Sequence, residues 1–174
     1  MDFKEINIYD LDLKLFDLID NKWGLIFVGD LKENNIMTAS WMSFGILWNY
    51  PVVNIYIRPT RYTYNLIEKN DFFSVSFFND NYNDKLKFCG TKSGRNINKV
   101  KECDFNLILK DFFIDRNKSF KFPIIKEAEI IFICQKIYFQ DIDKNNFLIP
   151  EINKNYNNDY HRCYIGKILT VFKK

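Results

Sequence analysis

The segment that most constrains the fold is residues 128–140, AEIIFICQKIYFQ, the longest strand candidate in the chain. Apolar residues fall on both faces of such a strand. A second run, FFSVSFF at 72–78, places Phe73, Val75 and Phe77 on one face. Aromatic residues make up 18% of the 174 residues, which favours one sizeable core built mainly from strands.

The rest of the pattern predicts further strands separated by short helices. Residues 9–20 fit both a helical stripe and an alternation, and we favour a short helix or an irregular lid. We expect strands at 23–28, 35–41, 52–57 (buried on both faces), 105–109 and 160–172, helices at 62–69 (N-capped by Thr60), 84–88 and 97–103, and loops at 45–51 and 141–158. Regular βαβ alternation is lacking, so we predict a mainly β fold with short helices, as a mostly antiparallel barrel. The length suits a single domain over 1–174, and the alternative is two small halves.

Charge and cysteine usage argue against several classes of function. The formal net charge is +3, and basic residues are interleaved with acidic ones, so no basic stripe indicates a nucleic-acid partner. Four cysteines without a CxxC pair, and one histidine, argue against a zinc site. No run approaches the ~20 apolar residues of a membrane helix, and no secretion signal is visible. We therefore expect a cytoplasmic protein with no metal and no membrane contact.

Residues 35–41, NIMTASW, mix small hydroxyl residues with large apolar ones. We expect this segment to be the second strand of a hairpin whose first strand is 23–28. Thr38, Ala39 and Ser40 place little bulk beside the backbone, so a flat ligand could approach it closely. An ordinary half-buried strand explains the pattern equally well.

Two further segments could bind phosphate. RPTRYT at 58–63 combines a predicted helix start with two guanidinium groups and two threonine hydroxyls. GTKSGR at 90–95 places hydroxyl and basic groups between and after two glycines, as in anion-binding loops. A routine helix corner and a surface turn are the plainer interpretations. Together with the strand at 35–41, the two segments point to a flat, phosphorylated cofactor.

The sequence shows no nucleophile paired with a base. His161 is the only histidine, and it could be a ligand contact or a structural residue. A hydrolase is therefore disfavoured, and the chemistry would have to come from a cofactor.

Four ordered motifs carry a family resemblance that extends over roughly residues 23–171. They are NIMTASW (35–41), IRPTRYT (57–63), FCGTKSGR (88–95) and YHRCYIG (160–166). With them the chain resembles the flavin reductase-like, FMN-binding split-barrel family, particularly its flavoredoxin-like bacterial members. The resemblance implies a six-stranded antiparallel Greek-key split barrel that forms a homodimer and binds FMN near the subunit interface.

The resemblance also implies roles for individual residues. The isoalloxazine ring would contact Thr38, Ala39, Ser40 and Trp41. The phosphate and ribityl chain would lie among Arg58, Arg61, Tyr62, Thr63, Gly90, Thr91, Lys92 and Ser93, with Arg95 a further candidate.

One departure from the family pattern concerns the electron donor. Many short-chain flavin reductases carry Gly-Asp-His on a strand in the second half, where this chain reads EAEIIF at 127–132. His161 could substitute in the pocket. The implied function is an FMN-dependent oxidoreductase using NAD(P)H. The alternatives are a flavin carrier reduced by a redox protein, as in flavoredoxin-like members, and a binding protein that uses the barrel without flavin.

Overall fold

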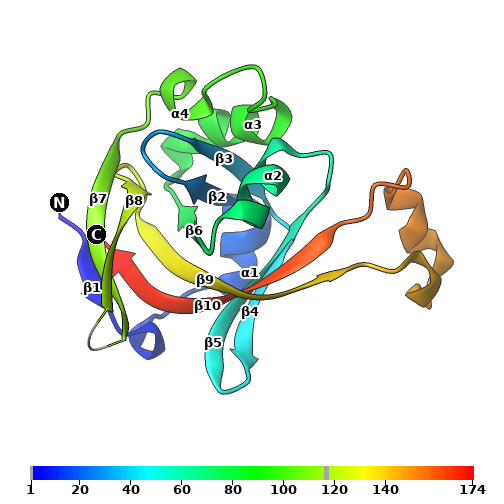
Figure 1. Ribbon diagram of the computed structural model, residues 1–174, viewed down its shortest axis with the longest axis horizontal. Helices are drawn as coiled ribbons and strands as arrows, with labels where there is room; N and C mark the ends of the chain where they lie inside the picture. Colours follow the sequence, from blue (N-terminus) through cyan, green and yellow to red (C-terminus); the bar gives the residue numbers. More distant parts are fainter. Residues whose placement is uncertain (1, 116–117) are drawn as a thin grey trace.

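The computed structural model describes residues 2–115 and 118–174, and its main body is a curved antiparallel sheet (Figure 1). The strands follow the order β3-β2-β6-β9-β10-β5-β4, and β1 pairs with β10 beside this path. Their bounds are β1 Lys4–Ile6, β2 Gly24–Gly29, β3 Asn34–Ala39, β4 Met42–Leu47, β5 Tyr50–Ile57, β6 Phe72–Phe77, β9 Ile130–Asp141 and β10 Arg162–Lys173. β3 and β4 are the two ends of this strand order and do not pair with each other within the described residues, so the barrel is open, as in a split barrel.

Short helices and a separate hairpin pack against the two sides of this sheet. The α-helices are α1 Leu15–Asp17, α2 Tyr62–Lys69, α3 Asn83–Thr91 and α4 Lys99–Glu102. A π-helical turn spans Leu18–Lys22, and 3-10 turns span Ile8–Asp10, Asp80–Tyr82, Lys144–Asn146 and Pro150–Asn155. β7 (Leu107–Asp115) and β8 (Lys118–Ile125) form a second, two-stranded sheet. The mainly β architecture with short helices is confirmed.

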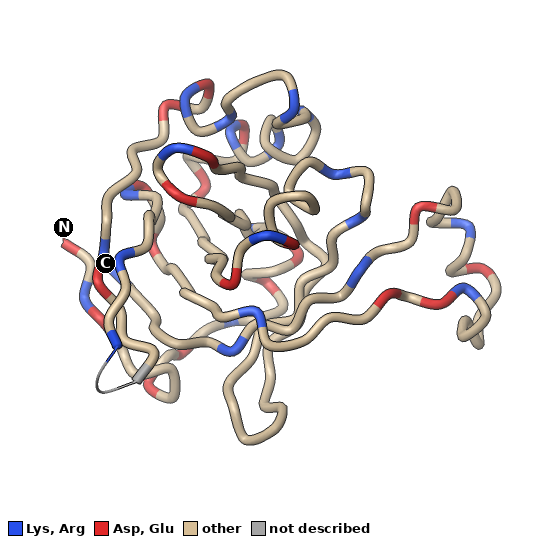
Figure 2. Tube along the Cα trace, in the orientation of Figure 1, with Lys and Arg blue, Asp and Glu red and all other residues tan. Residues whose placement is uncertain are grey.

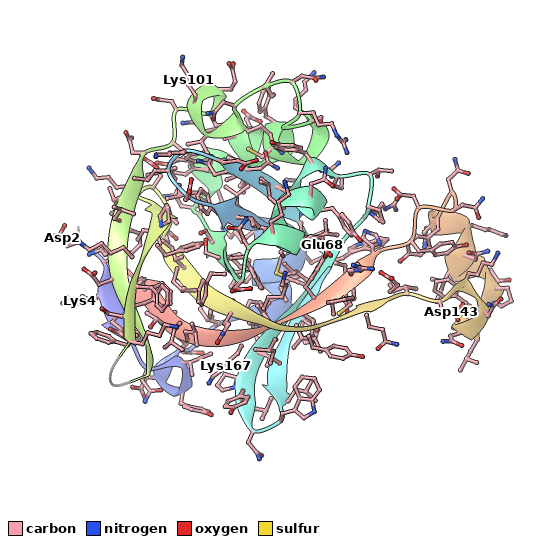
Figure 3. All side chains as sticks on the ribbon, viewed as in Figure 1. Asp2, Lys4, Glu68, Lys101, Asp143 and Lys167 are labelled. Carbon is pink, nitrogen blue, oxygen red and sulfur yellow. The ribbon has the colours of Figure 1, made fainter. Side chains whose placement is uncertain are left out.

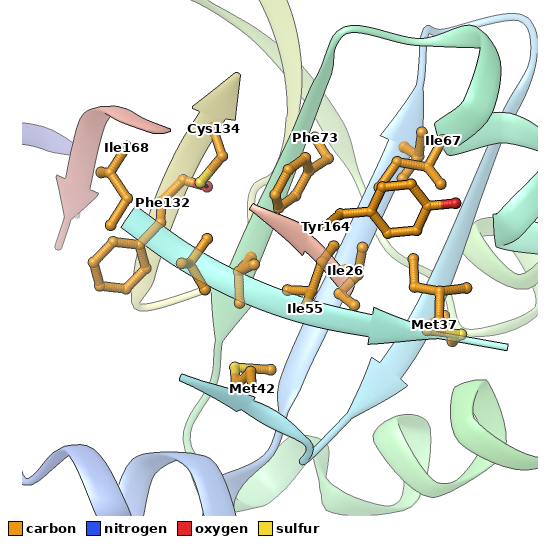
Figure 4. Close-up of a cluster of buried hydrophobic side chains, with 14 of the residues drawn as sticks. Ile26, Met37, Met42, Ile55, Ile67, Phe73, Phe132, Cys134, Tyr164 and Ile168 are labelled. Atoms are coloured by element: carbon orange, nitrogen blue, oxygen red, sulfur yellow. Dashed lines mark hydrogen bonds between the residues drawn. The ribbon is translucent and has the colours of Figure 1, made fainter. Parts of the chain in front are cut away.

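The sheet separates two apolar cores, which explains its continuous apolar runs. On β2, Ile26 and Val28 point into the barrel core, while Leu25 and Phe27 pack into an outer core with α3, α4 and the β7–β8 hairpin. Figure 4 shows Ile26, Phe73 and Tyr164 within the barrel core. Buried side chains alternate between two cores here, so β2 has no solvent face. The apolar run at 128–140 is buried on both faces from Ile130 to Cys134, after which β9 becomes exposed.

Several sequence predictions are wrong in detail. The expected loop at 45–51 is a hairpin of β4 and β5, and its two turn residues have positive φ values of 51° at Trp48 and 60° at Asn49. Such a primed turn suits a two-residue hairpin, but it usually carries Gly, so the pattern concealed it. Burial of β5 on both faces is also wrong, because Asn54 and Tyr56 are only partly buried.

The region before residue 128 holds more strand than the sequence indicated. β7 continues to Asp115 rather than ending at Leu109, and neither β8 nor the short β1 was predicted. Thr60 does not cap α2: the N-cap residue is Arg61, and the Thr60 hydroxyl donates to Oδ2 of Asp159 at 2.5 Å.

The ends of β9 and β10 extend beyond the barrel and carry an arm formed by residues 142–161 (Figure 1). Figure 3 labels Asp143 on this arm, well away from Glu68 on α2. Stacked aromatic rings hold the arm together, with ring centroids 4.9 Å apart for Tyr156 and Tyr160 and 5.8 Å apart for Phe147 and Tyr156. These contacts link residue 147 to residues 156 and 160 within the arm.

Charges of both signs are interleaved along the described trace, as Figure 2 shows. In the same part of the chain, no helix is long and apolar enough to cross a membrane. The described residues also contain no cluster of three or more His, Cys, Asp or Glu side chains arranged to hold a metal ion.

Candidate functional site

A cavity of about 360 Å³ lies where the end of β3, the β5–α2 corner and the root of the arm meet. Segments far apart in the sequence come together here, as the ribbon shows (Figure 1). The lining residues are Met37, Thr38, Ala39, Ser40, Trp41, Tyr56, Arg58, Thr60, Arg61, Asp159 and His161. The cavity thus unites the predicted residues of the first segment, both predicted arginines and the histidine.

The end of β3 presents its backbone to the cavity because its side chains are small or directed elsewhere. The Thr38 hydroxyl donates to the carbonyl of Leu86 on α3 at 2.7 Å, which ties the strand to that helix. The β2–β3 ladder ends at Ala39, so the chain leaves the sheet at Ser40. Trp41 follows at the rim, 48% exposed, with its ring centroid 5.1 Å from that of His161. A flat group could rest on the small residues at the end of β3, beside the rings of Trp41 and His161.

Arg58 and Arg61 supply two positive charges to the cavity wall. Arg61 donates from Nη2 to the carbonyl of Gly90 at 2.6 Å, and from Nε to Sδ of Met37 at 3.4 Å. Burial, and then the charge of Arg58, lower the pKa of Arg61, but a guanidinium group stays protonated in proteins. Arg58 donates from Nη2 to the carbonyl of Asn155 at 3.1 Å and lies over the ring of Tyr156. Both side chains are therefore held in place by the protein.

His161, the last residue of the arm, is 8% exposed and lies beside Arg58. Its Nε2 accepts a long hydrogen bond of 3.4 Å from Nε of Arg58, which places the ring proton on Nδ1, 3.3 Å from the hydroxyl of Tyr156. Burial, followed by the charge of Arg58, lowers the pKa of His161 to about 4. The imidazole is therefore neutral at physiological pH, and its only proton already has an acceptor within the protein.

The third predicted segment, 90–95, does not line the cavity. Gly90 and Thr91 belong to the last turn of α3, with Lys92 as its C-cap, so the expectation of a free loop is wrong there. The Thr91 hydroxyl donates back to the Lys87 carbonyl at 3.0 Å, and the Ser93 hydroxyl accepts from the amide of Arg95 at 3.3 Å. Among the residues of this segment, Gly90 contributes a carbonyl that anchors Arg61.

Tyr62 and Thr63, in the first turn of α2, also lie behind the cavity wall. Thr63 is 1% exposed, and its hydroxyl accepts from Nδ2 of Asn35 at 2.7 Å. Gly94 packs against the same place: a Cβ there would lie 2.1 Å from Oδ1 of Asn35 and 2.9 Å from Cδ1 of Tyr62. The Arg95 guanidinium donates to the Thr60 carbonyl at 2.8 Å. These residues join the second and third segments into one support for the cavity.

Three residues near the cavity were missed by sequence reasoning. Tyr56 lines the cavity from β5, and Asp159 lines it from the arm. Lys99 is 3% exposed and donates from Nζ to the carbonyl of Cys89 at 2.9 Å. Burial lowers the pKa of Lys99 to about 8; the Cys89 thiol opposes this shift and the charge of Arg61 adds to it. Alternation along β5 could have identified Tyr56, but no sequence signal marks Lys99 or Asp159.

Comparison with known proteins places this geometry in context. A family model described as the flavin reductase like domain matches residues 23–171. A search of curated proteins gave no match.

Several solved structures share the fold at low sequence identity. A flavoredoxin from Methanosarcina acetivorans is 20% identical with a TM-score of 0.63, and the match covers 88% of this chain and 68% of that one. An FMN-binding protein from Thermus thermophilus is 20% identical with a TM-score of 0.61, covering 87% and 70%. An NADH:FAD oxidoreductase from Streptomyces globisporus is 14% identical with a TM-score of 0.61, covering 88% and 75%.

The structural matches establish the fold, and the family model extends over most of the chain, including every segment that lines the cavity. The chain therefore belongs to the family of flavin reductase like domains.

Proposed function

We propose that this protein is an FMN-binding oxidoreductase of the flavin reductase-like kind, which takes electrons from NADH or NADPH. The observation that carries the proposal is the shared cavity in which the small-residue end of β3 meets Arg58 and Arg61. The end of β3 suits the flat ring of FMN, which needs open backbone, and the two arginines suit its phosphate, which needs cationic donors.

The residues of the cavity fit an FMN phosphate. Nη1 of Arg58 and Nη1 of Arg61 make no hydrogen bond to the described part of the chain, so each keeps a donor for a ligand. Asp159 is the one acidic side chain among the described lining residues, and one of its oxygens accepts from Thr60. Two fixed cations therefore outweigh one partly occupied carboxylate.

The chain's own part in the reaction is to bind and orient. When bound, the isoalloxazine ring supplies two-electron chemistry at its N5 atom. The amides of residues 38–41 would hold the ring edge and stabilise negative charge that develops on it. Trp41 and His161 would flank the ring side of the cavity. The neutral imidazole adds no positive charge to those of Arg58 and Arg61.

A titration with three flavins tests the cofactor assignment. Flavin-free protein should quench the fluorescence of FMN with higher affinity than that of riboflavin, because riboflavin lacks the phosphate. FAD, which carries a diphosphate, should bind more weakly than FMN. Equal affinity for FMN and riboflavin would remove the phosphate role of the arginines. A protein that binds no flavin would instead use the barrel for another ligand.

A specific observation favours a second candidate, a flavoredoxin-like carrier that does not oxidise NAD(P)H directly. Many short-chain flavin reductases are expected to have a histidine on the strand that corresponds to residues 127–132, and this chain has none there. Ala128 and Ile131 of this segment are fully buried in the outer core. Neither residue faces the cavity. Anaerobic mixing of the FMN-loaded protein with NADH or NADPH separates the two candidates. Rapid bleaching supports the reductase, and bleaching only by a reduced redox protein supports the carrier.

We also propose a cytoplasmic homodimer. All four cysteines are free thiols, as expected in a reducing compartment. The arm exposes 97% of Leu148 and 57% of Ile149, and the β4–β5 hairpin exposes 54% of Trp48. Contiguous exposed apolar patches mark association surfaces, and these side chains are the candidates for such a surface here. Light scattering after gel filtration should give twice the chain mass, and Leu148→Asp with Ile149→Asp should reduce it. A wild-type monomer would contradict the dimer.

A further inference from the structure

Two cysteine thiols lie side by side behind the cavity wall. Cys89 is in the last turn of α3, Cys103 follows α4, and their Sγ atoms are 3.5 Å apart. Both are buried, with 0% and 4% exposure. The other two thiols are separate: Cys134 belongs to the barrel core, and Cys163 lies half-buried on β10.

The distance between the sulfur atoms is short enough for a bond to form after a small movement. A disulfide has an S–S length of about 2.05 Å, so the two atoms must approach by about 1.5 Å. α4 is a single turn whose N-cap Asn98 accepts from the amide of Lys101 at 3.0 Å. A helix of one turn has few backbone hydrogen bonds to hold it, so it can shift or open locally. A small shift of α4 can therefore bring the Cys103 sulfur to bonding distance of Cys89.

A buried cation lies next to the pair. Nζ of Lys99 donates to the carbonyl of Cys89 at 2.9 Å, and its side chain is 3% exposed. Burial, and then the neighbouring Cys103, raise the pKa of Cys89 to about 12, although the charge of Lys99 acts in the opposite direction. Positive charge beside a thiol favours the thiolate, which is the reactive form. Lys99 thus makes the pair more reactive than burial alone would allow.

We propose that Cys89 and Cys103 form a reversible dithiol–disulfide site that reacts by exchange with a low-molecular-weight disulfide. The Cys103 thiol, which keeps slight exposure, loses its proton and attacks one sulfur of the small disulfide. This step forms a mixed disulfide and releases one thiolate. The Cys89 thiol then loses its proton and attacks Sγ of Cys103, which releases the second thiolate. Two protein thiols are oxidised and one small disulfide is reduced to two thiols.

The Cys89–Cys103 disulfide would form next to the proposed flavin site, but its formation does not require bound flavin. Cys89 immediately precedes Gly90, whose carbonyl accepts the hydrogen bond from Arg61. The cross-link would close a short loop over residues 89–103 and join α3 to α4 on the outer side of β3. Such a loop restricts the unfolded chain, so the oxidised protein should be more stable than the reduced one.

The experiment compares the reduced full-length chain with the chain incubated with oxidised glutathione. After alkylation under denaturing conditions, the oxidised protein should have lost two alkylatable thiols and two hydrogens of mass. Peptide mapping should give one peptide pair that joins residues 89 and 103, and dithiothreitol should separate it. The unfolding midpoint should rise by several degrees on oxidation.

Single variants make the assignment specific. Cys89→Ser and Cys103→Ser should each abolish the cross-link, whereas Cys163→Ser should leave it unchanged. If a serine variant fails to fold, peptide mapping of the wild-type chain still decides. Four alkylatable thiols after oxidation, or glutathione attached only at Cys163, would overturn the proposal. Because the readout is a mass, the result does not depend on whether the chain binds flavin.

Discussion

Segments 58–61 and 90–95 carry the same kinds of residues, yet only the first lines the cavity. Both combine hydroxyl groups with positive charges, and both sit where a helix meets a loop. The first precedes α2 and holds Arg58, Thr60 and Arg61 at the cavity wall. The second contains the end of α3, and its Gly90 carbonyl accepts a hydrogen bond from Arg61 of the first. Similar composition therefore gives a ligand-facing segment in one case and a supporting one in the other.

The polarity of the neighbouring helix explains the difference. A helix N-terminus carries a partial positive charge and free N–H groups, whereas a C-terminus carries free carbonyls and a partial negative charge. At the end of α3, Lys99 donates to the Cys89 carbonyl and Arg61 to the Gly90 carbonyl. Two cations thus neutralise the end that would repel a phosphate. The second segment serves the site by fixing Arg61.

The largest expected effect comes from Arg61, where the two segments meet. Arg61→Ala should weaken FMN binding about 100-fold, or about 3 kcal/mol, because it removes a charged donor and leaves the Gly90 carbonyl unpaired. Arg61→Lys keeps the charge and should lose less. Fluorescence titration measures both. If Arg61→Ala binds FMN normally while Lys92→Ala does not, then segment 90–95, and not segment 58–61, is the one that binds the phosphate.

Acid should act on the first segment through His161. Its folded-state pKa of about 4 lies below the usual value of 6.5, so between these values the unfolded chain binds a proton that the folded chain does not. Stability should therefore fall as pH drops from 6.5 to 4, by at most about 3 kcal/mol. Urea unfolding across this window should show the loss. In His161→Gln the same pH dependence should be much smaller, and an unchanged one would assign the loss to other groups.

Gly94 tests whether the second segment is a packed support. Gly94→Ala should cost about 2 kcal/mol of unfolding free energy, because its Cβ would overlap the Asn35 amide and force the packing apart. Gly45→Ala is the matched control, since no atom lies within 4 Å of a Cβ at that position. Urea denaturation of both variants gives the comparison. Equal stability would mean that the 90–95 segment moves freely.

The smallest effects belong to the residues that the family resemblance placed near the phosphate but that lie outside the cavity lining. Thr63→Ala should weaken FMN binding about fivefold through loss of the Asn35 hydrogen bond, and Thr63→Ser should restore it. Lys92 is exposed, so Lys92→Ala should cost about twofold or threefold. Unchanged affinity in both alanine variants would remove these two residues from the phosphate site.

Local patterns predicted most of the architecture and part of the site. The runs at 23–28, 72–78 and 160–172 each became a strand within one or two residues, because apolar residues recur along each run. The turn at Trp48 and Asn49 lacked its usual glycine, so one hairpin was interpreted as a loop. β8 was missed altogether, although its residues from Phe122 to Ile125 are buried in the outer core.

The sequence by itself determined the split-barrel family, the two arginines of the β5–α2 corner and the small-residue strand beside them. These features depend on local residue order, which a motif or a period records directly. Only the tertiary structure decided that His161 and Asp159 face that corner from the arm, that Lys99 is buried behind it, and that Cys89 meets Cys103. Such contacts depend on how the sheet folds over, and residues that meet across it leave no common pattern along the chain.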